Sequence, residues 1–144
     1  MASIYDTNPN ELIEKTAQEL KKHLTMPSWA FFVKTGHFKV KPPMNNDWWF
    51  YRGASLLRKI ALNGPLGVSR LRNLYGGKKN RGHRPEHKYS AAGKAIRVLL
   101  QQLEKAELIK QTQKGTHKGR ILTSKGEKFL ASQSKALKVK PSSS

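Results

Sequence analysis

The residues that point most directly to a chemistry stand in one run, GGKKNRGHRPEHKY, at positions 76–89. Its cations face a single acid, Glu86, and are Lys78, Lys79, Arg81, Arg84 and Lys88. A guanidinium fork binds two phosphate oxygens, and an ammonium binds as a point charge. The glycines of the run lack a Cβ and let the backbone come close to a phosphate; they are Gly76, Gly77 and Gly82. We therefore predict nucleic-acid contact from Tyr75 to Lys88.

Three polar residues after this run share one surface. Lys94, Arg97 and Gln101 follow one another at spacings of three and four, which places them on one face of a helix. An ordinary solvated stripe has the same pattern. Of these two interpretations we favour contact with RNA.

Metal binding and catalysis find little support. His83 and His87 have the spacing of a helical zinc site, but Pro85 lies between them and two ligands are too few. The chain has no cysteine, no phosphate-cradling G-x-x-x-x-G-K motif, and no recognised grouping of serine, histidine and acid. We predict a binding protein without metal or cofactor, not an enzyme.

The adjacent tryptophans Trp48 and Trp49 admit two interpretations. An exposed ring in a basic setting can stack on a base. Two neighbours on a helix point about 100° apart, so both can also be structural. We favour the structural interpretation, with Trp49 in the core and Trp48 under the segment from Trp29 to Phe38.

The charge of the chain is large and regional. It has 28 Lys and Arg against 9 Asp and Glu, a formal net charge of +19, and between Trp48 and Leu103 twelve cations face one acid. Such a surplus favours a polyanionic partner, because phosphate contacts release counterions. No apolar run approaches the roughly 20 residues of a spanning helix, and the first residues lack a secretory signal. We expect a cytosolic protein without membrane contact.

Helices must position the charged residues. Apolar periodicity predicts helices at 8–24, 47–61 and 68–74, with Asn8 and Asp47 as caps of the first two. The stretch from Pro27 to Pro43 is typical of an extended, aromatic segment that wraps the body.

The second half alternates irregular and regular segments. Residues 76–89 lack apolar periodicity and are predicted to form a loop, and a helix follows at 90–107. Short strands at 108–111 and 120–122 enclose a basic hairpin tip at 114–119.

The last helix is expected to begin at a capping box formed by Ser124 and Glu127. The order of elements predicts a mainly α fold, a helical bundle with a winged-helix core and a small β-hairpin. Residues 1–137 then form a single winged-helix-like RNA-binding domain with an N-terminal helix and an extended aromatic segment, and 138–144 form a flexible basic and serine-rich tail. The predicted core contains Leu56, Ile60, Leu71, Ile96, Leu99, Leu103 and Phe129.

Four segments resemble one known family, the archaeal and eukaryotic small-subunit ribosomal protein nineteen, the e-type family. They lie at 29–36, 47–55, 64–67 and 74–82, the last being LYGGKKNRG. The tyrosine, double glycine and basic run make the last segment specific. Outside 29–82 the resemblance is one of general pattern, and the short N-terminal start resembles archaeal members.

This resemblance implies a mostly helical winged-helix fold, a place in the head of the small subunit, and a part in late maturation of its RNA. The expected partners are the rRNA of the small subunit and neighbouring ribosomal proteins, with a cytoplasmic, structural role and a monomer when free. It adds Arg52 to the expected RNA-binding residues, which are Arg52, Tyr75, Gly76, Gly77, Lys78, Lys79, Arg81, Gly82, Arg84, Lys88, Lys94 and Arg97.

A winged-helix DNA-binding transcription regulator is the alternative, with 90–107 as recognition helix and 114–120 as wing. A helix-turn-helix normally has a connection of three or four residues. The long basic segment at 76–89 would hinder docking into a major groove, which favours the ribosomal interpretation.

Overall fold

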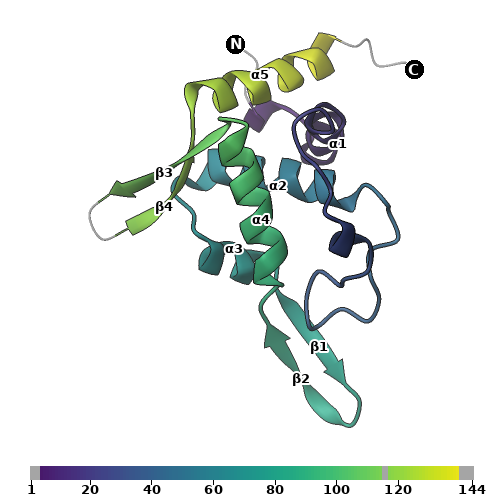
Figure 1. Cartoon of the computed structure of the whole chain (residues 1–144). Helices are drawn as coiled ribbons and strands as arrows, with labels where there is room; N and C mark the ends of the chain where they lie inside the picture. The colour runs from purple at the N-terminus through teal and green to yellow at the C-terminus, as the bar shows by residue number, and fades with distance from the viewer. Residues whose placement is uncertain (1–3, 115–116, 140–144) are drawn as a thin grey trace.

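The computed structural model describes residues 4–114 and 117–139. Its helices are α1 (Pro9–Leu20), α2 (Trp48–Asn63), α3 (Val68–Leu74), α4 (Gly93–Lys105) and α5 (Ser124–Val139). Two 3-10 turns are η1 (Ile4–Asp6) and η2 (Ser28–Phe31). Two antiparallel hairpins pair β1 (Gly77–Arg81) with β2 (Arg84–Tyr89), and β3 (Ile109–Lys114) with β4 (His117–Leu122). The prediction of a mainly α fold with a small hairpin is confirmed (Figure 1).

Helix α1 begins as its sequence predicts. The Asn8 side chain accepts a hydrogen bond from the Asn10 amide at 3.0 Å, and Pro9 occupies the first turn. The helix ends at Leu20, earlier than predicted, and residues 21–23 continue as turns. Its buried face packs against α2.

Helix α2 departs from prediction at its start. Asp47 makes no capping hydrogen bond, because its carboxylate lies 3.0 Å from the Lys21 ammonium. The predicted side-chain cap at this position is therefore wrong. The helix ends at Asn63, two residues later than predicted, and its C-cap Gly64 has a φ of +74°, a conformation that glycine adopts without a Cβ penalty.

The core lies among α1, α2, α3 and α4, and Ile109 of β3 and Leu130 of α5 are also buried in it. The predicted core residues share one cluster: Leu56, Ile60, Leu71, Ile96, Leu99 and Leu103 are buried in it, and Phe129 is partly buried against it. Trp49 is also fully buried, and its indole N–H donates to the Gln102 side chain at 3.1 Å. The helix register predicted for α4 is therefore correct.

The segment at 27–43 is not the extended wrap that was predicted. It includes the 3-10 turn η2, and two of its aromatics, Phe31 and Phe32, are exposed instead of packed. The prediction for Trp48 is confirmed, since its indole N–H donates to the Ala30 carbonyl at 3.2 Å under this segment.

The order of elements from α2 to β4 is consistent with the winged-helix prediction. Helices α2, α3 and α4 are followed by the β3–β4 hairpin, and the link between α2 and α3 reaches this hairpin through an isolated antiparallel bridge. The bridge joins Leu66 to Arg120 by two backbone hydrogen bonds of 3.0 and 3.2 Å. Residues 115 and 116, part of the predicted basic tip, lie outside the described residues.

The predicted loop at 76–89 is a β-hairpin, which is a correction. Apolar periodicity gave no sign of it, because the hairpin covers no core and its residues are mostly exposed. Asn80, at the end of β1, and Gly82, in the turn, were the residues of this run that are typical of a hairpin turn.

Helix α5 is capped by Thr123 and not by Ser124. The Thr123 hydroxyl accepts from the Gly126 amide at 3.1 Å, so the cap lies one residue earlier than predicted. The third helical residue is then Gly126, which has no side chain to complete the predicted capping box. Residues 138 and 139, assigned to the tail from sequence, belong to this helix, and 140–144 lie outside the described residues.

Truncation of Leu99 to Ala tests the core. Leu99 is fully buried in α4, so the substitution should lower the free energy of unfolding by about 2 to 5 kcal/mol in urea titrations. Lys105→Ala, at an exposed position of the same helix, is the control and should change it by less than about 0.5 kcal/mol. Equal, small effects would contradict the packing of α4.

Gly126→Ala tests the start of α5. A Cβ at Gly126 would overlap the Leu108 carbonyl oxygen. The resulting overpacking should cost about 1 to 3 kcal/mol, although alanine is the better helix former by about 1 kcal/mol. Ser132→Ala, exposed in the same helix, serves as the control in thermal unfolding. A gain in stability for Gly126→Ala would show that the contact is not tight.

Candidate nucleic-acid interface

The β1–β2 hairpin owes its shape to a tight two-residue turn. Arg81 pairs with Arg84, which leaves Gly82 and His83 as the turn. Gly82 has a φ of +73°, and its amide donates to the Asn80 side chain at 3.0 Å. A glycine at the first position of such a turn matches the twist of the strands. A register shift between Lys79 and Arg81 adds a bulge.

The hairpin carries its cations away from the body. Figure 1 shows it projecting from the end of the helical body where α3 and α4 meet. Lys78 and Lys88 are exposed and lie directly opposite each other across the strands. Like charges in this position destabilise a sheet, and in the described residues no ion pair involves a hairpin cation. An anion between the strands would relieve this repulsion.

The other face of the hairpin is stiffened by rings. Tyr89 lies between His37 and His87, with ring centroids 4.7 and 5.0 Å away. The Lys79 ammonium lies 3.3 Å from His37 Nε2, and the Arg81 guanidinium donates to the Pro85 carbonyl at 2.8 Å. Lys79 and Arg81 are consequently half-buried, and their charges are held close to the strands.

Two of the glycines that were predicted to let a phosphate come close are required by the packing of this chain itself. A Cβ on Gly76 would lie 2.6 Å from the Tyr89 carbonyl oxygen, and one on Gly77 would lie 2.8 Å from the Phe38 ring. The space beside both is thus filled by this chain. Close approach of a phosphate to these glycines stays a prediction.

The joint between the hairpin and α4 is held by an arginine that sequence reasoning did not single out. The Arg72 side chain donates to the Ala91 carbonyl at 2.8 Å, and the Ala91 amide donates back to the Arg72 carbonyl at 3.0 Å. The Ala92 amide donates to the Thr35 carbonyl at 2.9 Å. These bonds fix the direction in which the hairpin leaves the body.

At the base of the hairpin, Arg52 and Tyr75 come together. The Arg52 guanidinium lies over the Tyr75 ring at 4.1 Å, and the Lys59 ammonium lies 5.0 Å from the same ring. The Tyr75 hydroxyl is 2.5 Å from the Ser55 hydroxyl. Burial raises the pKa of the Tyr75 phenol, so the ring stays neutral at physiological pH, and burial lowers the pKa of Arg52, which as a guanidinium remains charged.

This cluster opens into a pocket of about 510 Å³ that Lys39 and Lys41 also line. Neither lysine was predicted from the sequence, nor were Ser55 and Lys59. Ser55 and Lys59 follow Arg52 at helical spacing, which was an available signal. The lysines come from an irregular segment, where spacing carries no such information.

The stripe predicted on α4 is present. Lys94, Arg97 and Gln101 are exposed, opposite the buried face of the helix. The Lys94 ammonium lies 4.7 Å from the centre of the Trp29 ring, a cation–π contact that holds it beside the joint with the hairpin. The predicted site residues therefore gather around the hairpin and the first turns of α4.

The His83–His87 pair and the described helices bear on metal binding and membrane spanning. His83 lies in the turn and His87 in β2, so the two histidines are not on a helix, as the zinc interpretation of their spacing requires. Within 4–114 and 117–139, no three His, Asp or Glu side chains group as a metal site. The described helices also include none long and apolar enough to cross a bilayer.

Comparison with known proteins assigns the chain to a family. It is 38% identical over 134 residues to small ribosomal subunit protein eS19 of Aeropyrum pernix, covering 90% of this chain and 86% of the relative. The eS19 of Thermoplasma volcanium is 40% identical, covering 95% and 90%. The eS19 of rice is 38% identical, covering 89% and 87%.

Two of these relatives are archaeal, which is consistent with the predicted archaeal membership, and the rice protein is equally similar. The family model described as ribosomal protein S19e matches residues 3–140. Such a match, together with relatives of this similarity, agrees with a structural and non-enzymatic role. The chain belongs to the ribosomal protein S19e family.

Proposed function

We propose that this protein is a structural constituent of the small ribosomal subunit in the cytoplasm, and that it binds rRNA there through the β1–β2 hairpin, the Arg52–Tyr75 cluster and the exposed face of α4. The observation that carries the proposal is the hairpin itself. It presents five cations against one acid on strands that cover no core. A two-stranded hairpin with so little apolar burial is only marginally stable by itself, so its role is better explained by binding to a partner.

Phosphate is the chemistry that these residues fit best. Lys78, Arg84 and Lys88 are exposed, and the first and last of them repel each other across the strands. Each contact with a phosphate releases a condensed counterion. The Arg52–Tyr75 cluster adds a half-buried cation and a ring at the base of the hairpin, where a backbone phosphate or an unstacked base can be held.

A major-groove DNA reader is less compatible with this geometry. A helix-turn-helix brings its two helices together through a short turn, whereas the whole β1–β2 hairpin stands between α3 and α4. The hairpin would meet the DNA backbone before the α4 face entered a groove. Folded small-subunit rRNA should therefore outcompete duplex DNA at fixed salt.

The placement in the subunit head and the role in late maturation follow from the family resemblance. Depleting the protein should accumulate a precursor of small-subunit rRNA, and the protein should sediment with small subunits in sucrose gradients. Normal processing after depletion would contradict the maturation role. A protein found only in a free or chromatin-bound pool would contradict the ribosomal role altogether.

Removing the hairpin charges tests the interface. A variant with Gln at positions 78, 79, 81, 84 and 88 keeps the length of the hairpin and loses five cations. If about five phosphate contacts are made, the slope of log K against log salt should shrink by roughly four in filter-binding assays with small-subunit rRNA. Stability should change little, since these residues lie outside the core.

The control replaces exposed lysines on other faces, Lys105, Lys128 and Lys135, with Gln. Its slope should change less per charge removed. Equal changes per charge would mean that the diffuse field of a +19 chain, and not the hairpin, drives binding.

A further inference from the structure

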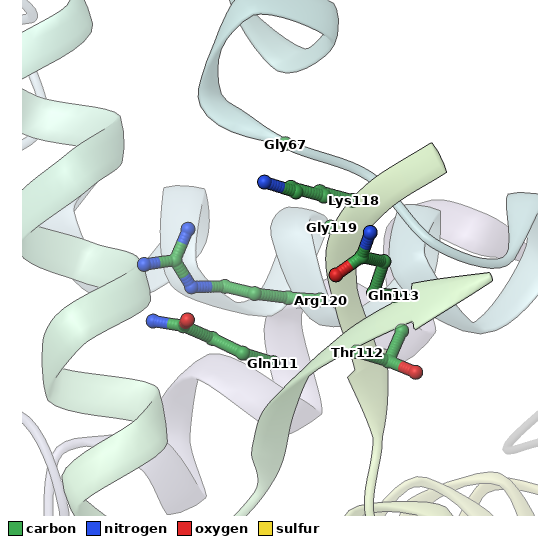
Figure 2. A pocket seen from close by; sticks show the side chains of 7 residues that line it. All are labelled: Gly67, Gln111, Thr112, Gln113, Lys118, Gly119 and Arg120. Carbon is green, nitrogen blue, oxygen red and sulfur yellow. The ribbon is translucent and has the colours of Figure 1, made fainter. Parts of the chain in front are cut away.

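The β3–β4 hairpin has a polar face that the proposed interface does not use. In the antiparallel register Gln111 pairs with Arg120, and Gln113 pairs with Lys118. Because side chains alternate along a strand, these four share one face. Figure 2 shows the Gln111, Lys118 and Arg120 side chains directed to the same side of the hairpin, while Thr112 points away.

This face forms one wall of a pocket of about 600 Å³, and the chain at Gly67 forms another (Figure 2). The two walls are fixed to each other. Leu66 and Arg120 exchange backbone hydrogen bonds, and a Cβ on Gly119 would lie 2.8 Å from the Leu66 amide nitrogen. The absence of a side chain at Gly119 thus lets the hairpin lie against the α2–α3 link.

The cations of this face differ in their surroundings. The Arg120 guanidinium is paired with Glu104 on α4, so its charge is largely compensated. Lys118 is exposed, and in the described part of the chain no ion pair involves it. Gln111 and Gln113 are exposed beside these cations, and their side chains are amides, which can both donate and accept hydrogen bonds.

The lining of the pocket indicates the class of ligand. It consists of polar residues and glycines only: Gly67, Gln111, Thr112, Gln113, Lys118, Gly119 and Arg120. Small-molecule sites are lined mostly by apolar and aromatic side chains, and protein interfaces depend on buried apolar anchors. Amides and a cation without apolar anchors fit the phosphates, sugar hydroxyls and base edges of RNA.

We propose that this face of the β3–β4 hairpin, with Gln111, Gln113 and Lys118, is a second RNA-binding surface. Figure 1 shows the two hairpins projecting from different sides of the helical body. One chain would then join two separate segments of rRNA. The proposal rests on the proposed function, because it adds a contact to an RNA already bound at the β1–β2 hairpin.

A matched pair of substitutions tests the surface. Lys118 and Lys110 are both exposed lysines of this hairpin, but the register places Lys110 on the opposite face. Lys118→Gln should reduce the salt slope for small-subunit rRNA by roughly one, the value for one phosphate contact. Lys110→Gln removes the same charge and should reduce it clearly less.

Directed cleavage locates the contact. The chain has no cysteine, so Gln113→Cys and His83→Cys can each carry a tethered iron–EDTA group in reconstituted subunits. Strong cleavage from position 113 at an rRNA segment different from the one cleaved from position 83, with weak cleavage from Lys110→Cys, is the expected result. Cleavage from position 113 that is absent, or confined to the segment cleaved from position 83, would overturn the proposal.

The outcomes separate this inference from the proposed function. If the five-Gln variant of the β1–β2 hairpin weakens binding while Lys118→Gln equals Lys110→Gln, only the second surface is refuted. If Lys118→Gln leaves rRNA affinity unchanged but lowers incorporation into subunits, the surface binds a protein, and the inference is again wrong. If the five-Gln variant also behaves like its lysine control, the proposed function fails with it.

Discussion

Burial of α4 is the interaction on which both hairpins depend. Its apolar face packs into the core through Leu99 and Leu103, and β2 enters at its first turn while β3 leaves at its last. The direction in which the chain leaves α4 towards β3 is set by Glu107, which adopts a φ of +65°. The Leu108 amide donates to the Leu103 carbonyl, as in a helix C-cap. A shift of α4 would therefore move both charged surfaces together.

The large positive charge of the chain is compatible with an apolar core because the charged side chains lie outside that core. Burying a cation without a partner costs several kcal/mol. The cations of the β1–β2 hairpin avoid that cost because Lys78, Arg84 and Lys88 are exposed, and the half-buried Lys79 and Arg81 have polar partners. Arg52 is the exception. It is desolvated, which lowers its pKa, and the face of the Tyr75 ring compensates it in part. Arg52, Lys79 and Arg81 are half-buried, and each has a specific partner.

The sequence allowed the helical part to be predicted because buried helices have a period that apolar residues reveal. The register of α4 and the burial of Leu71 and Ile60 follow from that period. The β1–β2 hairpin has no such period, since both of its faces are polar, and only Asn80 and Gly82 marked a turn. The Asp47 cap failed for another reason: a lysine distant in sequence, Lys21, holds its carboxylate. Tertiary partners of this kind are invisible to local pattern.

The candidate site shows the same division between local and tertiary information. The basic run could be recognised from composition. Composition did not distinguish, anywhere in the chain, cations that face solvent from cations that bind another part of the protein. Arg72 lies in the last turn of α3, and its side chain donates a hydrogen bond to the Ala91 carbonyl. Arg120 forms an ion pair with Glu104, although it lies on the same face of β4 as the exposed Lys118. A count of positive charges therefore overstates the number of available phosphate contacts. The geometry leaves a smaller set of accessible cations, on the two hairpins, at Arg52 and on the exposed face of α4.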